Sequence, residues 1–134
     1  MRLIETSHLK TWADSLAAKS RFPYIIKSLI LAVIKPEKLR MPYGDDIWLP
    51  GYDGIVTNSE TNRFVPFGMS IWEAGTESDI KGKADGDYKK RSVDNNEDLE
   101  KNAKLNVKID RSNTTFVFAT PRIWKGKDDW INER

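Results

Sequence analysis

Two carboxylates lie in stretches that read as neighbouring strands. Asp53 stands in "GYDGIV", and Glu73 stands in "SIWEAG", between Trp72 and Ala74. Burying an ionised carboxylate among apolar residues costs several kcal/mol unless a partner compensates it. Two carboxylates on adjacent strands can share one Mg²⁺, a hard cation that prefers oxygen ligands. Such an ion, helped by a nearby lysine, could activate water and neutralise the charge that develops when a phosphodiester is hydrolysed.

The sequence pattern around the two carboxylates predicts the strands that must position them. Residues 54–75 predict two strands with a turn near residues 58–62, the second strand covering about 68–75. Side chains alternate along a strand, so Glu73 shares a face with Ile71 and Gly75, and Trp72 faces the other way. Residues 114–122 predict a third strand, rich in β-branched and aromatic residues.

Helical patterns surround these strands. Residues 7–19 and 23–34 predict two N-terminal helices, the second with Pro23 in its first turn. Residues 80–104 predict a helix, a polar break and a second helix, and another helix is expected to start at Asp128 or Asp129. Residues 40–54 predict a loop with a short extended piece. The order indicates one α/β domain on a mixed central sheet flanked by helices.

Composition limits the chemistry. The chain has 134 residues, no cysteine and a single histidine, His8. Disulfides, thiolate metal sites and histidine-based triads are therefore excluded or disfavoured. No apolar run is long enough to span a bilayer, and the first residues lack the pattern of a signal peptide, so a cytoplasmic location is expected. Residues 44–60 carry four acidic and no basic residues, whereas residues 81–91 carry five basic and two acidic ones.

Longer stretches resemble a known family. "GYDGIV", "FVPFGMSIWEAGT", "DIKGKADGDYKKR" and "TFVFATPRIWKGKDDW" resemble the PD-(D/E)xK nuclease-like domain at the N-terminus of bacterial antiviral STAND-type NTPases. The resemblance covers nearly the whole of residues 1–134, and it implies a restriction-endonuclease-like core in one domain, expected to be part of a larger protein. It implies Asp53 and Glu73 as catalytic residues and ligands of Mg²⁺ or Mn²⁺.

The lysine of this family pattern has no direct counterpart. The position two residues after Glu73 is Gly75. The resemblance implies that a lysine on the following helix takes the catalytic role, with Lys83 the first choice and Lys81 the second. Asp87 follows Lys83 by one helical turn and could orient it.

The function implied is that of a Mg²⁺-dependent DNA endonuclease, the effector of an antiphage defence protein with further NTPase or sensor domains and homo-oligomeric assembly. Phosphate-backbone contacts without base reading are expected from basic residues in two segments: Lys81, Lys90, Arg91, Arg122, Lys125 and Lys127. Two alternatives stay open. The fold could be an inactive module used for oligomerisation or docking, or it could bind nucleic acid without cleaving it.

Overall fold

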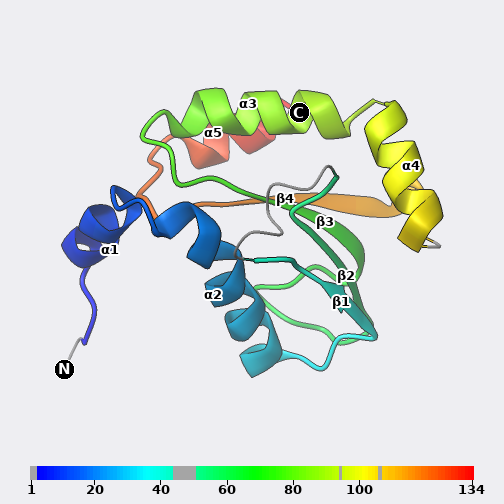
Figure 1. Ribbon diagram of the computed structural model, residues 1–134, viewed down its shortest axis with the longest axis horizontal. Helices are drawn as coiled ribbons and strands as arrows, with labels where there is room; N and C mark the ends of the chain where they lie inside the picture. Colours follow the sequence, from blue (N-terminus) through cyan, green and yellow to red (C-terminus); the bar gives the residue numbers. More distant parts are fainter. Residues whose placement is uncertain (1–2, 44–50, 94, 106) are drawn as a thin grey trace.

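The computed structural model describes residues 3–43, 51–93, 95–105 and 107–134. These residues form helices around one sheet (Figure 1). In chain order the elements are α1 (Thr6–Ala13), α2 (Ala18–Val33), β1 (Lys38–Arg40), β2 (Gly54–Asn58), β3 (Gly68–Ala74), α3 (Ile80–Arg91), α4 (Asn96–Leu105), a 3-10 turn (Arg111–Asn113), β4 (Thr114–Ala119) and α5 (Lys127–Asn132).

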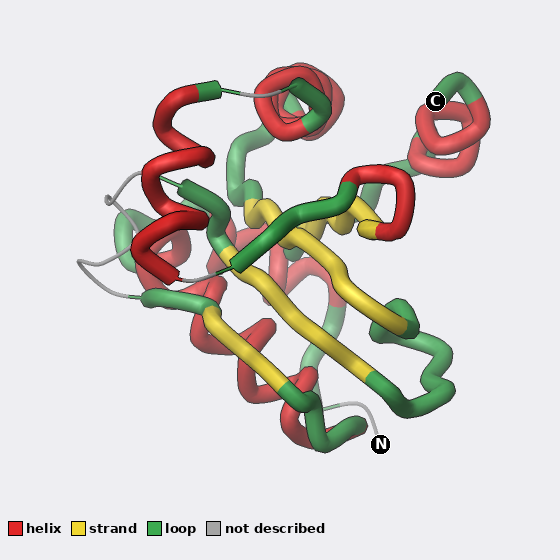
Figure 2. Tube along the Cα trace, turned by 90° about the vertical axis from the view of Figure 1, so that its right-hand side faces the viewer, coloured by secondary structure: helices red, strands yellow, loops and turns green. Residues whose placement is uncertain are grey.

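The four strands lie in the order β1-β2-β3-β4 (Figure 2). The pairs β1/β2 and β2/β3 are antiparallel, and β3/β4 is parallel. A parallel pair needs a crossover connection, and α3 and α4 supply it here. The sheet is therefore mixed, as the sequence predicts. In the β2/β3 register Gly54 lies opposite Trp72, and in the β3/β4 register Glu73 lies opposite Phe118.

The two faces of the sheet bury different side chains. On one face Val56 and Trp72 pack with Phe22, Ile26 and other apolar residues of α2. The opposite face carries a smaller apolar group that includes Ile55 and Ile71. There α3 crosses the sheet, with α5 beside it and α4 near its end (Figure 1).

Aromatic rings join α3 and α5 to this second face. The ring of Tyr88 in α3 meets Phe116 of β4 at 5.4 Å between centroids and Trp130 of α5 at 5.8 Å. Offset and edge-to-face ring pairs of this kind add to the burial of apolar area. The helix that carries Lys83 and Arg91 is therefore fixed on the face where Glu73 points.

Most elements agree with the sequence-based expectation, and four details differ. The first helix, expected over residues 7–19, ends at Ala13. The strand pair, the broken helix over residues 80–104 and the strand from Thr114 are confirmed. However, α2 begins at Ala18, so Pro23 lies inside the helix and not in its first turn. Ala18 and Phe22 are both buried, and this packing offsets the cost of an internal proline, about 3 kcal/mol. In addition, β1 forms at residues 38–40, just before the stretch expected to be loop, and α5 begins one residue earlier than expected.

Candidate active site

Asp53 and Glu73 meet at the end of the β2/β3 pair. Gly54 is paired with Trp72, so the antiparallel register places Asp53 opposite Glu73. Asp53 Oδ2 accepts a hydrogen bond from the backbone N–H of Ala74 at 2.8 Å. Glu73 is only 3% exposed, and its carboxyl group is within hydrogen-bonding reach of Asp53. The two carboxylates are therefore close enough to ligate one ion, as the sequence hypothesis requires.

The environment of Glu73 strongly favours its protonated form. Burial raises the pKa of Glu73 to about 9, and the charge of Asp53 and a hydrogen bond to it act in the same direction. Arg91 opposes this rise without cancelling it. A carboxyl group that keeps its proton at neutral pH beside a second carboxylate can exchange that proton for a metal ion.

Arg91, the last residue of α3, lies under Glu73 and not on the surface. Its Nε donates to Glu73 Oε1, its Nη1 donates to Asp98 Oδ1, and its Nη2 donates to the carbonyl oxygen of Gly51. The residue is 5% exposed. The guanidinium also lies 5.0 Å from the ring centroid of Tyr52. These contacts leave Arg91 unavailable to a phosphate backbone in this structure, contrary to the expectation from sequence.

The stem of Lys83 passes close to Gly75, the position two residues after Glu73. A Cβ atom built on Gly75 would lie 2.9 Å from Lys83 Cγ and 2.7 Å from Phe118 Cζ. The stem of Lys83 therefore occupies space that a side chain at position 75 would need. The side chain of Lys83 keeps 31% of its surface exposed.

Asp87 holds the ammonium group of Lys83. The Lys83 Nζ to Asp87 Oδ1 distance is 2.9 Å. Burial works to lower the pKa of Lys83, but the hydrogen bond and charge of Asp87 outweigh it and raise that pKa. Burial raises the pKa of Asp87, and Asp53 contributes in the same direction. Asp87 Oδ2 is buried and accepts no hydrogen bond within the described part of the chain.

The charges gathered here do not balance. In this cluster of described residues, four carboxyl groups lie with two cations, and because Glu73 favours its protonated form, one formal negative charge is unmatched at neutral pH. Buried charges are costly unless they are paired, protonated or bound to a metal. A divalent cation would supply the missing charge. The six groups are Asp53, Glu73, Asp87, Asp98, Lys83 and Arg91.

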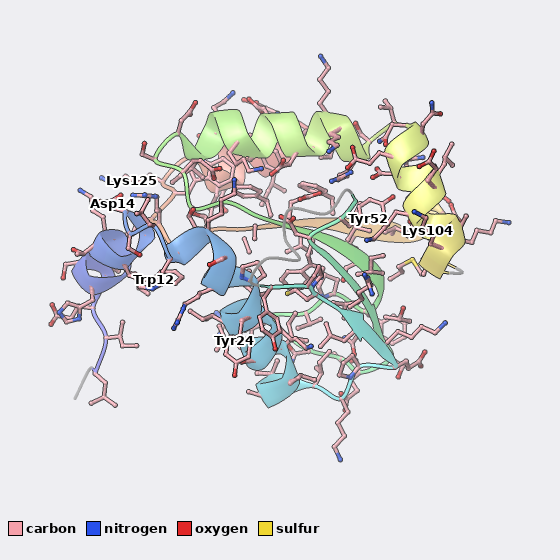
Figure 3. All side chains as sticks on the ribbon, viewed as in Figure 1. Trp12, Asp14, Tyr24, Tyr52, Lys104 and Lys125 are labelled. Atoms are coloured by element: carbon pink, nitrogen blue, oxygen red, sulfur yellow. The ribbon has the colours of Figure 1, made fainter. Side chains whose placement is uncertain are left out.

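The remaining basic residues expected to hold a phosphate backbone fall into two groups. Arg122 is engaged, because its Nε donates to the Thr76 carbonyl at 2.7 Å and its Nη2 pairs with Asp14 at 2.6 Å. Four lysines are exposed: Lys81, paired with Asp85, Lys90, paired with Glu97, and Lys125 and Lys127. Figure 3 places Lys125 near Asp14 and α1, away from Tyr52.

The sequence contained a sign that Arg91 points inward. Ala84 and Tyr88 face the sheet, and Arg91 follows Tyr88 by three residues, on the same side of the helix. Asp98 had no such sign, because α4 is polar and its contact with Arg91 depends on the turn between the helices. The acidic residues Asp45 and Asp46 and the aromatic Trp48 lie outside the described residues.

Comparisons with protein-family models, curated proteins and solved structures returned no match. Within residues 3–43, 51–93, 95–105 and 107–134, no group of three or more His, Cys, Asp or Glu side chains is arranged to hold a metal ion. No helix in these ranges is long and apolar enough to cross a membrane. The class defined by fold and site is thus a mixed α/β domain with a buried glutamate beside a half-buried aspartate and a lysine near them.

Proposed function

We propose that this chain is a metal-dependent endonuclease module that cleaves DNA phosphodiester bonds. Asp53 and Glu73 would hold Mg²⁺ or Mn²⁺, hard cations that prefer oxygen ligands. The observation that carries this proposal is the meeting of the buried carboxyl group of Glu73 with Asp53, in a cluster where carboxyl groups outnumber cations. A surface network would be screened by solvent and would need no such cation.

The protein's own groups fit the rest of the chemistry. A bound Mg²⁺ supplies an activated water and neutralises charge on the phosphate. Lys83 presents an ammonium beside this position, oriented by Asp87 and placed over Gly75. An ammonium held in this way stabilises negative charge as it develops on phosphate oxygens. This arrangement explains how Lys83 on α3 could take the role of the strand lysine that the resemblance expects at position 75.

The resemblance adds the biological setting to this proposal. It makes the module a restriction-endonuclease-like effector in an antiphage defence protein, attached to NTPase or sensor domains, assembled as a homo-oligomer and acting in the cytoplasm. DNA is proposed as the substrate on the same ground. The exposed lysines at positions 81, 90, 125 and 127 supply backbone contacts without reading bases.

The test is cleavage of supercoiled plasmid with Mg²⁺ or Mn²⁺. Glu73→Gln removes a metal ligand with almost no change of shape, and Lys83→Met removes the ammonium. Each is expected to lower the cleavage rate by roughly 10²-fold or more. Glu100→Gln and Lys104→Met, at exposed positions of α4, are the matched controls and are expected to cleave as wild type does.

The outcomes separate the roles. Loss of cleavage in Glu73→Gln alone would keep the nuclease and move the lysine role to Lys81. Equal rates for wild type and Glu73→Gln would show that the cleavage does not come from this site. Absence of cleavage by wild type, also when assembled with its neighbouring domains, would contradict the proposal.

A second candidate function is that of a docking module, and one observation favours it. An apolar groove of ≈ 1310 Å³ runs along the outer side of β4, bounded by α1, α2 and α5. Exposed side chains such as Leu29, Phe64 and Ile123 lie along it, whereas Asp53, Glu73 and Lys83 do not. Apolar surfaces of this extent often mark interaction sites. Titration with Mn²⁺ discriminates the two functions, since a docking module need not bind metal at the carboxylate pair.

A further inference from the structure

Each of the three guanidinium nitrogen atoms of Arg91 donates a hydrogen bond. Nε is bonded to Glu73 on β3, Nη1 to Asp98 on α4, and Nη2 to the Gly51 carbonyl at 2.5 Å. The planar fork of an arginine fixes the direction of each bond, which the single ammonium of a lysine cannot do. The Glu73 oxygen that Arg91 holds is thereby fixed, and with it the rotamer of the carboxyl group.

The partners of Arg91 are themselves held. Asp98 Oδ2 accepts from Asn95 Nδ2 at 2.9 Å, and the Asp98 N–H donates to Asn95 Oδ1 at 2.8 Å. Asp98 is only 2% exposed, so it has little freedom to turn away. The position of Arg91 is therefore set by α4 as well as by its own helix.

Helix α4 also holds the backbone that leads to Asp53. Glu97 Oε1 accepts from the Gly51 N–H at 2.8 Å, while Arg91 binds the carbonyl of the same residue. Gly51 has φ of +115°, and a Cβ there would lie 2.8 Å from Lys101 Cγ. The backbone two residues before Asp53 is thus clamped at its N–H and its C=O and packed closely against α4.

These contacts converge on the spacing of the two carboxylates. Arg91 fixes Glu73 directly, and Arg91 together with Glu97 fixes the approach to Asp53. A buried ion pair adds little net stability compared with apolar packing, so stability alone is a weak account of this cluster. Groups that orient metal ligands typically change metal affinity by about 10- to 100-fold when they are removed.

We propose that Arg91, held by Asp98, is a positioning residue that sets the metal affinity of the Asp53–Glu73 pair. It contacts neither substrate nor metal, and it acts by fixing the carboxylate of Glu73 opposite Asp53. This inference rests on the proposed metal-dependent function of the same pair. It assigns Arg91 a role inside the protein in place of the DNA contact expected from sequence.

The test measures binding of Mn²⁺ by calorimetry and the Mn²⁺ concentration that gives half-maximal plasmid cleavage. Arg91→Lys keeps the charge but loses the fork, and both quantities are expected to shift toward weaker metal binding by about 10- to 100-fold. DNA affinity measured in Ca²⁺ is expected to stay within about twofold of wild type, because Arg91 does not reach the backbone. Arg21→Lys, at an exposed site on α2, is the matched control.

Asp98→Asn is a milder second variant that retains the Arg91 side chain but weakens its contact with α4, and it is expected to shift Mn²⁺ binding in the same direction by a smaller factor. It keeps the test available if Arg91→Lys does not fold. Wild-type Mn²⁺ affinity in folded Arg91→Lys and Asp98→Asn would overturn the inference and leave the nuclease proposal standing. A wild-type protein that neither binds Mn²⁺ nor cleaves would overturn both.

Discussion

Two adjacent residues of β3 show how differently the two faces of the sheet are used. Trp72 points into the apolar core beneath α2, where its Nε1–H donates to Ser70 Oγ at 2.8 Å. Glu73 points the opposite way, into the charged cluster beneath α3 and α4. The face beneath α2 is apolar, whereas the face beneath α3 and α4 combines a smaller apolar group with buried charges, which cost stability unless they are paired. The difference shows that two neighbouring residues of one strand can meet an apolar and a charged environment, because successive side chains lie on opposite faces of the sheet.

Replacing Trp72 should produce the largest loss of stability. Trp72→Ala removes a large buried side chain and leaves a cavity, so the free energy of unfolding is expected to fall by about 3–5 kcal/mol. By contrast, Glu73→Gln should change it by less than about 1 kcal/mol at neutral pH without metal, because the amide resembles the protonated carboxyl group. Urea unfolding in EDTA measures both. A larger loss in Glu73→Gln than in Trp72→Ala would reverse the comparison of the two faces.

Two glycines test whether Lys83 is packed where the site needs it. Gly75→Ala places a methyl group against Lys83 and Phe118, and it is expected to cost about 1–3 kcal/mol of stability and to reduce cleavage. Gly86→Ala on the same helix as Lys83 meets nothing within 4 Å, so it should stabilise by up to about 1 kcal/mol and leave cleavage unchanged. Thermal melting and plasmid cleavage of the two variants check this. Equal behaviour of both would mean that Lys83 does not depend on the space above Gly75.

The pH dependence of stability tests the charged face. The pKa of Glu73 is about 9 in the folded protein, above its ordinary 4.5. Between these values the folded state holds a proton that the unfolded state has lost, so stability should fall as pH rises, by about 1.4 kcal/mol per pH unit at most. Below pH 4.5 Glu73 is protonated in both states, so it contributes no pH dependence to the free energy of unfolding there. Unfolding in EDTA across this range is expected to show the slope in wild type, a weaker slope in Glu73→Gln, and reversal when Mn²⁺ is added.

Substitutions of the exposed lysines should have the smallest effects, because these side chains are packed on neither face of the sheet. Lys125→Ala and Lys127→Ala are expected to weaken DNA binding only severalfold each, with a reduction of about one in the slope of log affinity against log salt. Fluorescence anisotropy at several salt concentrations measures this. If the salt dependence of DNA binding is unchanged in these variants, the segment around Lys125 does not contact DNA. If either lysine variant lowered the cleavage rate by as much as Glu73→Gln is expected to, these lysines would instead belong to the active site.

Local pattern was sufficient to predict much of this protein. Alternation along residues 68–75 placed Glu73 on the face opposite Trp72, and the β2/β3 pairing brought Asp53 to it. The spacing of one helical turn between Lys83 and Asp87 predicted that the two could pair, and they do. These predictions succeed because strand and helix periods are local properties of the chain.

Contacts between distant segments could not be predicted in the same way. The inward course of Arg91, its bonds to Asp98 and Gly51, and the internal position of Pro23 depend on how helices dock onto the sheet. The sequence by itself determined the elements and the face on which each candidate residue lies. Only the tertiary structure decided which charges are buried together, because the cost of burying a charge depends on partners supplied by other elements.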